Sequence, residues 1–434
     1  MINENNFNKS LNDFFASKSK NYWDFSNREK TQLEKLFKYP GKMVSNMLLE
    51  ILDFFNKNLD IKNICDPFMG SGTILDLAVK LNINLIYGND LNPYSYILNN
   101  NKFFYHDITD DLVEKDILLF KEKYENIKLQ EFYFFNKIDK WYKKNVISEL
   151  SKIRYILYSN EFCYKHLLEV ALINISKDFS NDRKSTSKLH IKKDTDIDKI
   201  DSSLIFSKFL SYFLSITKAI TDELNIYNRK GNINLLNENI NKINNFIEKK
   251  SIDLIVTSPP YGDNKTTISY GQFSILPLLW LDKFNKTNYE YNFSKIDTDS
   301  LGGRLEDSKR KKEYLMKISP TFFKLTEKFV NNNSFNKVTN FIYDFLEALE
   351  NINDILKDQG YIVFILGNRR VSNIEIPFDQ ITIELLNYFN DYLLVSNFKR
   401  NIPIKTIPRI TSRVQNKPVE SISKETILIL QKIV

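Results

Sequence analysis

The segment SIDLIVTSPPYGD, residues Ser251–Asp263, predicts a buried strand that ends in a rigid turn. Residues 252–256 are mostly apolar, and the run is too short for a helix, as is typical of a parallel strand covered on both faces. Pro259 and Pro260 fix the backbone of the turn that follows. Because open α/β sheets bind ligands at the carboxyl ends of their strands, we expect this turn to lie in a ligand site.

The turn carries hydrogen-bond acceptors and an aromatic ring. An exocyclic amino group of a nucleobase is a poor nucleophile, because its lone pair is delocalised into the base. Acceptors on its two N–H bonds, such as the Ser258 hydroxyl oxygen and the Pro259 carbonyl, would favour a pyramidal nitrogen with an available lone pair. Tyr261 would then stack on the base. In the structural alternative, the Pro-Pro turn only ends the strand and Tyr261 is simply packed.

A second strand–turn–helix pattern lies at 63–81, NICDPFMGSGTILDLAVKL, with glycines in the turn and a helix from Thr73. Glycines admit close approach of a ligand, and helix N–H groups favour anions. The third glycine of a dinucleotide fingerprint is replaced by Leu75, and no Walker lysine follows. Asp90 ends the next short strand, 24 residues beyond Asp66, where an acid can bind ribose hydroxyls. The pattern predicts a nucleoside-bearing ligand with a small anionic group.

Composition limits the class of protein. The chain has 434 residues, 42% of them apolar, with a net charge of +7 that suits a polyanionic partner. Two cysteines and three scattered histidines predict neither a disulfide framework nor a metal site. The polar N-terminus lacks a signal-peptide pattern, and no apolar run approaches 18 residues, so we expect a cytoplasmic protein without a transmembrane helix.

Two long segments interrupt the strand–helix alternation, residues 101–230 and 264–336, and both have mainly helical periodicity. Basic clusters lie in the first, around 183–193, in the second, at 309–312, and in a later loop, 400–417. The chain ends on two strands joined by that loop, which suggests an antiparallel last strand.

Three motifs in this order resemble S-adenosylmethionine-dependent DNA methyltransferases that act on exocyclic amino groups: DPFMGSGT at 66–73, GND at 88–90 and TSPPYGD at 257–263. YPGKM at 39–43 is similar to the segment that precedes the cofactor loop in that family. The resemblance implies a Rossmann-like class I methyltransferase fold, an α/β fold whose seven-stranded, mostly parallel sheet has an antiparallel last strand. The implied division is a lead-in (1–35), three core parts (36–100 with the cofactor site, 231–263 with the Ser-Pro-Pro-Tyr turn, and 337–434) and two helical insertions. Insertion 101–230 is the candidate for target recognition, and insertion 264–336 is the candidate for DNA contact.

The resemblance also implies the residues of the site. The catalytic residues would be Ser258, Pro259, Pro260 and Tyr261. S-adenosylmethionine would contact Lys42, Asp66, Pro67, Phe68, Gly70, Ser71, Gly72, Thr73 and Asp90, with Asp90 on the ribose and Lys42 near the methionine carboxylate. An acid that faces the cofactor's adenine maps onto Asn237 or Glu238, and the sequence does not choose between them.

The expected substrate is double-stranded DNA, whose target base is flipped out of the duplex. A serine before Pro-Pro-Tyr is more typical of cytosine-N4 enzymes, whereas the motif order is unlike that of many of them, so adenine-N6 methylation is the first alternative. An RNA base methyltransferase and a non-catalytic DNA-binding module are the further alternatives. A cognate restriction endonuclease is an expected partner, and a nucleoid-associated location follows. The predicted DNA-binding residues are Arg183, Lys184, Lys188, Lys309, Arg310, Arg400, Lys405 and Arg409.

Overall fold

A computed structural model describes most of the chain. The described residues are 4–19, 21–25, 29–105, 107–183, 187–225, 232–264, 267–281, 295–330, 332–389, 392–402, 410–414, 417–420 and 422–433. For residues 4, 5, 225, 410–414 and 417–420 the description covers the backbone only. Of the predicted DNA-binding residues, Lys184, Lys405 and Arg409 lie outside the described residues.

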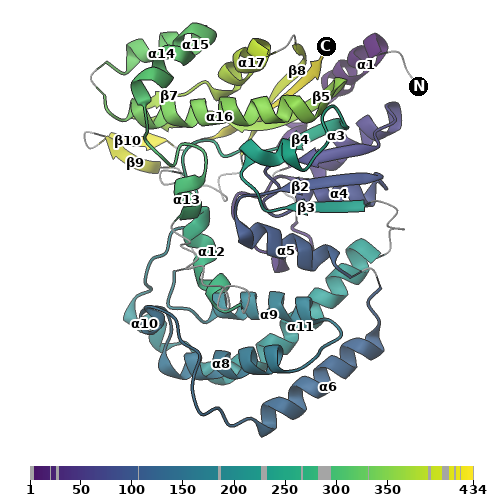
Figure 1. The fold of residues 1–434 in the computed structure, drawn as a ribbon, viewed down its shortest axis with the longest axis vertical. Coiled ribbons are helices and arrows are strands. Elements are labelled where there is room, and N and C mark those ends of the chain that lie inside the picture. Colours follow the sequence, from purple (N-terminus) through teal and green to yellow (C-terminus); the bar gives the residue numbers. More distant parts are fainter. Residues whose placement is uncertain are drawn as a thin grey trace.

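A seven-stranded sheet lies in the upper part of the molecule in Figure 1. Its spatial order is β3 (Asn232–Leu236), β2 (Leu85–Asn89), β1 (Asn63–Asp66), β4 (Ile252–Thr257), β5 (Leu356–Gly367), β11 (Lys424–Lys432) and β8 (Tyr392–Asn401). Neighbours pair in parallel except β11, which runs antiparallel to both β5 and β8. The predicted class I fold is therefore confirmed, with the last strand of the chain inserted between β5 and β8.

Both faces of the sheet are buried, as the apolar run of β4 predicts. Leu254 and Val256 belong to one core and Ile255 to the other, because successive side chains of a strand point to opposite faces. Ile252 also belongs to the second core, because the pairing of β4 with β5 shifts register between Ile252 and Leu254. The first core includes helices α3 (Ser45–Asn58), α4 (Thr73–Lys80) and α5 (Pro93–Phe103). The second includes η4 (Ile240–Asn245), α16 (Phe335–Ile355) and α17 (Phe378–Phe389).

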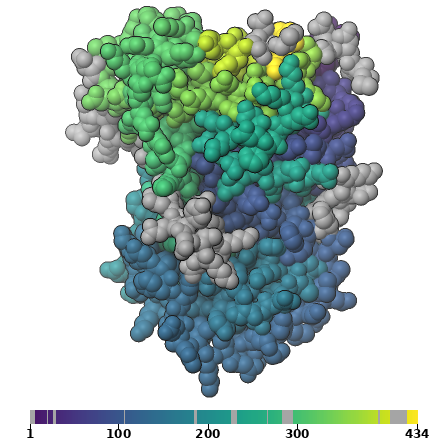
Figure 2. All heavy atoms as spheres, in the orientation of Figure 1, coloured from purple at the N-terminus to yellow at the C-terminus, as the bar shows by residue number. Residues whose placement is uncertain are grey.

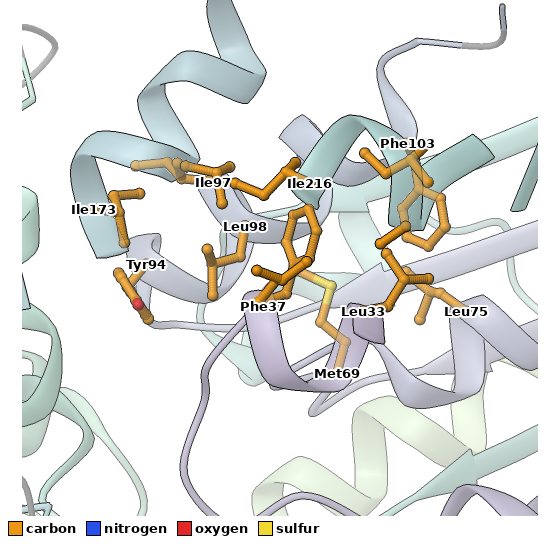
Figure 3. Packing of buried hydrophobic residues seen from close by; sticks show 14 of the residues in the cluster. Leu33, Phe37, Met69, Leu75, Tyr94, Ile97, Leu98, Phe103, Ile173 and Ile216 are labelled. Carbon is orange, nitrogen blue, oxygen red and sulfur yellow. The ribbon is translucent and has the colours of Figure 1, made fainter. Parts of the chain in front are cut away.

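The first insertion is helical, as expected, and forms the lower part of the molecule in Figures 1 and 2. Its elements are α6 (Asp110–Asn126), α7 (Ile138–Trp141), α8 (Lys144–Ser159), α9 (Lys165–Asp178), α10 (Asp194–Asp198), η2 (Ser202–Leu204), α11 (Ile205–Ile220) and a short π-helix, η3 (Thr221–Asn225). Apart from α10 and η2, which bury no side chain, these helices share one continuous core with the first face of the sheet. Figure 3 shows Ile173 of α9 and Ile216 of α11 in the same packed cluster as Met69 of the glycine-rich loop.

One helical stretch among the described residues, Ser202–Leu224, is long and apolar enough by length and composition to cross a membrane. The sequence predicts no such helix, because polar residues interrupt every apolar run. Within the stretch, Phe209, Phe213 and Ile216 are fully buried against the rest of the insertion. Its apolar face therefore contributes to the protein core.

The second insertion contributes to both halves of the molecule. Its helices are α12 (Tyr270–Leu279), α13 (Ile296–Asp299), α14 (Ser308–Ile318) and α15 (Pro320–Lys328). Helix α12 packs on α9, and Trp280 at its end is fully buried against Tyr133 and Tyr142 of the first insertion. Helices α14 and α15 pack instead on α16 and α17. The segment thus connects the helical insertion to the sheet (Figure 1).

The described residues of the 1–35 segment pack on the rest of the protein, whereas the sequence suggested a polar lead-in. Helix α1 (Glu4–Ala16) buries Phe7 and Leu11, and the Tyr361 hydroxyl donates to Asn8 Oδ1 at 2.9 Å. The short η1 (Tyr22–Asp24) packs on β8, and α2 (Gln32–Leu36) packs on α11. Two small hairpins complete the described elements: β6 (Arg370–Val371) with β7 (Ile374–Glu375), and β9 (Ile410–Val414) with β10 (Lys417–Glu420).

Candidate active site

A cavity of about 720 Å³ lies at the carboxyl ends of β1, β2, β3 and β4. The strand order reverses between β1 and β4, and α/β sheets bind ligands at such a switch point. Residues 67–71, 89–92 and 237–242 line the cavity, together with Ser258 and Pro260. Residues 39–43 and parts of the second insertion complete its wall. The structure therefore brings the three sequence motifs together in one cavity.

The glycine-rich loop needs its glycines for two reasons. Gly70 and Gly72 have φ values of 48° and 74°, in the left-handed region that side chains disfavour. A Cβ atom on Gly72 would also lie 1.9 Å from Asn99 Oδ1. The tight turn leads directly into α4, which begins at Thr73.

Asp90 joins the loops that follow β1 and β2. Its carboxylate accepts hydrogen bonds from the backbone N–H groups of Gly70 at 2.9 Å and Asn92 at 2.8 Å. Burial raises the pKa of Asp90 to about 6, against the effect of these hydrogen bonds. A carboxylate has about four lone-pair sites, so Asp90 retains acceptors on the cavity wall for ligand hydroxyls.

Asp66 lies beneath the cavity instead of on its wall. The side chain is fully buried, and its Oδ1 accepts from the Thr257 hydroxyl at 2.7 Å and from the Phe68 N–H at 3.1 Å. Burial raises the pKa of Asp66 to about 7. Through Thr257 it ties the glycine-rich loop to the residue that precedes the Ser-Pro-Pro-Tyr turn.

Lys42 lines the cavity, as predicted from its place in the YPGKM segment. Its ammonium donates to the backbone carbonyls of Glu34 at 2.6 Å and Phe37 at 2.7 Å. Burial, together with the nearby Lys102 ammonium, lowers the pKa of Lys42 to about 7. Since an ammonium has three donors, one remains to meet a ligand carboxylate.

Asn237 and Glu238 both line the cavity, with different roles. The Asn237 amide donates to the backbone carbonyls of Asp90 at 2.7 Å and Leu91 at 3.1 Å, so it holds the neighbouring loop. The Glu238 backbone pairs with the Asn89 side chain. Within the described part of the chain, the Glu238 carboxylate makes no hydrogen bond or ion pair and is available to a ligand.

The Ser-Pro-Pro-Tyr turn exposes Ser258 and Pro260 to the cavity, whereas Pro259 is buried. The Ser258 hydroxyl lies 3.2 Å from the Ile365 carbonyl, to which it can donate, and 3.1 Å from the Tyr261 hydroxyl. A hydrogen bond to β5 thus holds the turn in place, and Ser258 lies on the cavity wall.

The Tyr261 ring is packed against the end of β5 and is not part of the cavity wall. A Cβ atom on Gly367 would lie 2.5 Å from Tyr261 Cδ2, so the ring occupies the space that this glycine leaves open. Its hydroxyl donates to Glu425 of β11 at 3.0 Å. This arrangement resembles the structural alternative for Tyr261 more than the stacking role that the sequence suggests.

Besides Phe68, two tyrosines face the cavity. Tyr39 and Tyr270 both line it, with ring centroids 5.5 Å apart and planes 20° apart. The sequence gives neither residue a role of its own, although Tyr39 begins the YPGKM segment. The position of Tyr39 in the YPGKM motif could have indicated that it lies in the site. Tyr270 belongs to no motif, so nothing in the sequence indicated its position.

The basic residues predicted to bind DNA differ in how far they are exposed to solvent. Arg183, Lys309 and Arg310 are exposed, and Arg310 pairs with Asp307 at 2.5 Å. Lys188 is partly exposed. Arg304, which the sequence does not single out as a site residue, lies on the cavity wall and pairs with Asp299 at 2.5 Å.

Arg400 does not occupy the surface position that a phosphate contact needs, and its assignment as a DNA-binding residue is wrong. Only 4% of it is exposed, and two of its guanidinium nitrogens donate to Glu425 Oε2, at 2.8 Å and 2.5 Å. A third nitrogen donates to the Asp24 carbonyl at 3.3 Å. The many basic residues of the 400–417 loop suggested that Arg400 is exposed, but Arg400 is the last residue of β8 whose side chain points into the protein.

Comparison with known proteins identifies the class that this fold and cavity define. Residues 45–276 match the family model described as D12 class N6 adenine-specific DNA methyltransferase. This match covers more than half of the chain, and the protein belongs to that family. It is also similar to the Type II methyltransferase M.MvaI of Kocuria varians, with 26% identity over 451 residues that cover 98% of this chain and 94% of the relative.

The family confirms the resemblance to S-adenosylmethionine-dependent DNA amino-methyltransferases, and with it the predicted cofactor. The residues present suit that cofactor. The cavity wall offers carboxylates at Asp90 and Glu238 as acceptors for hydroxyl and amino groups, and an ammonium at Lys42 for a carboxylate. The RNA and non-catalytic alternatives find no support, because the family acts on DNA.

Proposed function

We propose that the protein methylates the exocyclic amino nitrogen of a base flipped out of double-stranded DNA, at a specific sequence. The observation that carries the proposal is the single cavity, which contains both the cofactor-type loops and the Ser258 hydroxyl. A methyl donor held by those loops and a base amino group held by Ser258 would therefore meet in the same cavity.

The chain's own residues would hold the cofactor at three points. Asp90 would accept from the ribose hydroxyls, Lys42 would bind the methionine carboxylate, and Glu238 would accept from the adenine amino group. Glu238 is preferred to Asn237 for the last role, because the two donors of the Asn237 amide fix that side chain on the carbonyls of Asp90 and Leu91, whereas the Glu238 carboxylate makes no hydrogen bond or ion pair within the described residues.

Replacing Glu238 with alanine is expected to weaken S-adenosylmethionine binding by about tenfold, the cost of one hydrogen bond to a charged group. Calorimetry with the folded variant measures this affinity. Glu248→Ala is the matched control, since Glu248 is exposed, lies ten residues along the same connection and is not on the cavity wall. Unchanged affinity in Glu238→Ala would remove Glu238 from the cofactor site.

In the transfer step, protein groups would mainly position the base and accept hydrogen bonds. S-adenosylmethionine, when bound, supplies a methyl group already activated by its sulfonium. Ser258, on the cavity wall, would accept one N–H bond of the target amino group, and the carbonyl of the neighbouring Pro259, whose side chain is buried, is proposed as the acceptor of the other, so that the lone pair points at the methyl carbon. Acceptors fixed in this way need no reorganisation during the transfer.

The target base has two candidates with separate support. Adenine N6 is our first proposal, because the matching family model is described as N6 adenine-specific and its residues 45–276 include the Ser-Pro-Pro-Tyr turn. Cytosine N4, the preference drawn from the sequence, is the second candidate, favoured by serine as the first residue of that turn. Both bases present an amino group beside a ring nitrogen, so one arrangement of acceptors suits either.

Mass spectrometry of nucleosides from duplex DNA, methylated in vitro with isotopically labelled cofactor, tests the proposal. Labelled N6-methyladenine is the expected product, and N4-methylcytosine would select the second candidate. Label in 5-methylcytosine would contradict direct transfer to an amino nitrogen. A label found only in structured RNA added as a competitor would overturn the assignment of DNA as substrate.

Phosphate contacts are proposed for the exposed residues Arg183, Lys309 and Arg310 and for the partly exposed Lys188, and DNA binding should weaken with added salt. These contacts would offset the few kcal/mol that base flipping costs. The name of the relative, a Type II methyltransferase, supports a place in a restriction–modification system. A cognate endonuclease acting on the same site remains a prediction.

A further inference from the structure

We propose that Glu425 is a positioning residue that acts through Tyr261 to set the direction of the hydrogen bonds at Ser258, so that the serine meets the target base only as an acceptor. This inference rests on the proposed function and assigns a role to a residue on the last strand of the chain. Its basis is a continuous series of contacts from β8 to the cavity.

The two oxygens of the Glu425 carboxylate accept hydrogen bonds from different residues. Oε2 accepts both hydrogen bonds from Arg400, whereas Oε1 accepts from the Tyr261 hydroxyl at 3.0 Å. The Tyr261 oxygen lies in turn 3.1 Å from the Ser258 hydroxyl. Arg400 is buried, and the Glu425 side chain is 16% exposed, so water competes little for these groups.

The direction of each hydrogen bond follows from the number of protons available. A carboxylate paired with arginine has no proton to donate, so Tyr261 must donate to Glu425. A hydroxyl has one proton, and the Tyr261 oxygen can therefore only accept from Ser258. Burial and the Glu425 charge both raise the pKa of Tyr261, which keeps that proton in place.

The Ser258 proton then has two destinations, the Tyr261 oxygen and the Ile365 carbonyl, and both lie inside the protein. Its lone pairs remain for the cavity, where an amino group needs an acceptor. Without the charge of Glu425, Tyr261 could turn its proton toward Ser258. That proton would compete with the target N–H for the serine lone pairs.

Glu425→Gln tests this role with little change in shape. The two donors of Arg400 would retain the single acceptor oxygen of the glutamine, which turns its NH₂ group toward Tyr261. We expect single-turnover methyl transfer to slow by about 10- to 100-fold, since a hydrogen bond to a charged group is reversed. Affinities for S-adenosylmethionine and for DNA should stay within about twofold of wild type.

The decisive measurement is the same substitution in a Tyr261→Phe background, which removes the hydroxyl between Glu425 and Ser258. If Glu425 acts through that hydroxyl, Glu425→Gln has no further effect there, and the two substitutions are non-additive. If Glu425 only joins β11 to β8 through Arg400, its loss slows transfer equally in both backgrounds. Additive effects would overturn the inference.

Glu50→Gln is the matched control. Glu50 also accepts from a tyrosine hydroxyl, that of Tyr22 at 2.6 Å, and pairs with Lys18 at 3.6 Å, but neither Glu50 nor Tyr22 lines the cavity. Its transfer rate should equal that of wild type. A wild-type protein that methylates no DNA would overturn the proposed function and this inference with it. An active wild type with additive effects would overturn the inference alone.

Discussion

Ser258→Ala is expected to slow methyl transfer by about 10²–10³-fold, the usual effect of removing one catalytic hydrogen bond from a preorganised site. The alanine keeps the backbone of the turn but leaves the target amino group without its side-chain acceptor. Affinity for S-adenosylmethionine should remain near that of wild type, because the cofactor loops are untouched. Single-turnover kinetics and calorimetry measure the two quantities separately.

Ser251→Ala is the control for this experiment. Ser251 precedes the same strand, β4, at its amino end, and its hydroxyl donates to the Glu248 carbonyl at 2.6 Å. It is not part of the cavity wall, so its removal should leave the transfer rate unchanged. A fully active Ser258→Ala variant would contradict the mechanism, because no other side chain of the turn offers an acceptor to the cavity.

Asp90→Ala is expected to weaken S-adenosylmethionine binding by about 100-fold or more, since two hydrogen bonds between a carboxylate and the ribose hydroxyls are lost together. The glycine-rich loop also loses the acceptor of the Gly70 N–H. Calorimetric titration with S-adenosylhomocysteine measures the affinity without the transfer reaction. Equal binding by the variant and the wild type would remove Asp90 from the ribose site.

Asp253→Ala is the control for Asp90→Ala, because it removes a carboxylate that accepts backbone hydrogen bonds but does not contact the cofactor. The Asp253 carboxylate also accepts two backbone N–H groups, from Lys62 at 2.9 Å and Asn63 at 2.8 Å, but at the amino end of β4, away from the cavity. Both variants should therefore melt at lower temperature than wild type. Only Asp90→Ala should lose cofactor affinity.

The parts of the fold that sequence patterns predict best are those defined by neighbouring residues. The apolar run of β4 shows that both of its faces are covered, and the spacing from Asp66 to Asp90 spans one strand–helix–strand unit. These features depend on local periodicity and on the glycines of one turn. The strands that lead into the two turns, the glycine-rich turn itself and the position of Ser258 were accordingly predictable, whereas the seven-stranded sheet and the cofactor were implied by the resemblance to the methyltransferase family.

Features that depend on distant residues could not be predicted in the same way. Tyr261 and Glu425 are 164 positions apart, and only the pairing of β11 with β5 brings them together. Arg400 was assigned to the surface because a basic loop follows it, whereas strand alternation turns it inward. Helix α1 was taken for a polar lead-in because its many asparagines mask the apolar stripe of Phe7 and Leu11.

The common core of the glycine-rich loop and the first insertion limits how this enzyme can be re-engineered (Figure 3). Met69 and Phe37 pack in one cluster with Ile173 and Ile216, so residues 101–230 are not a detachable cassette. Replacing them with the equivalent segment of a relative would leave apolar surface exposed beside the cofactor loop. Chimeras that aim at a new recognition sequence should therefore retain the inward faces of α9 and α11 and exchange only outward-facing residues.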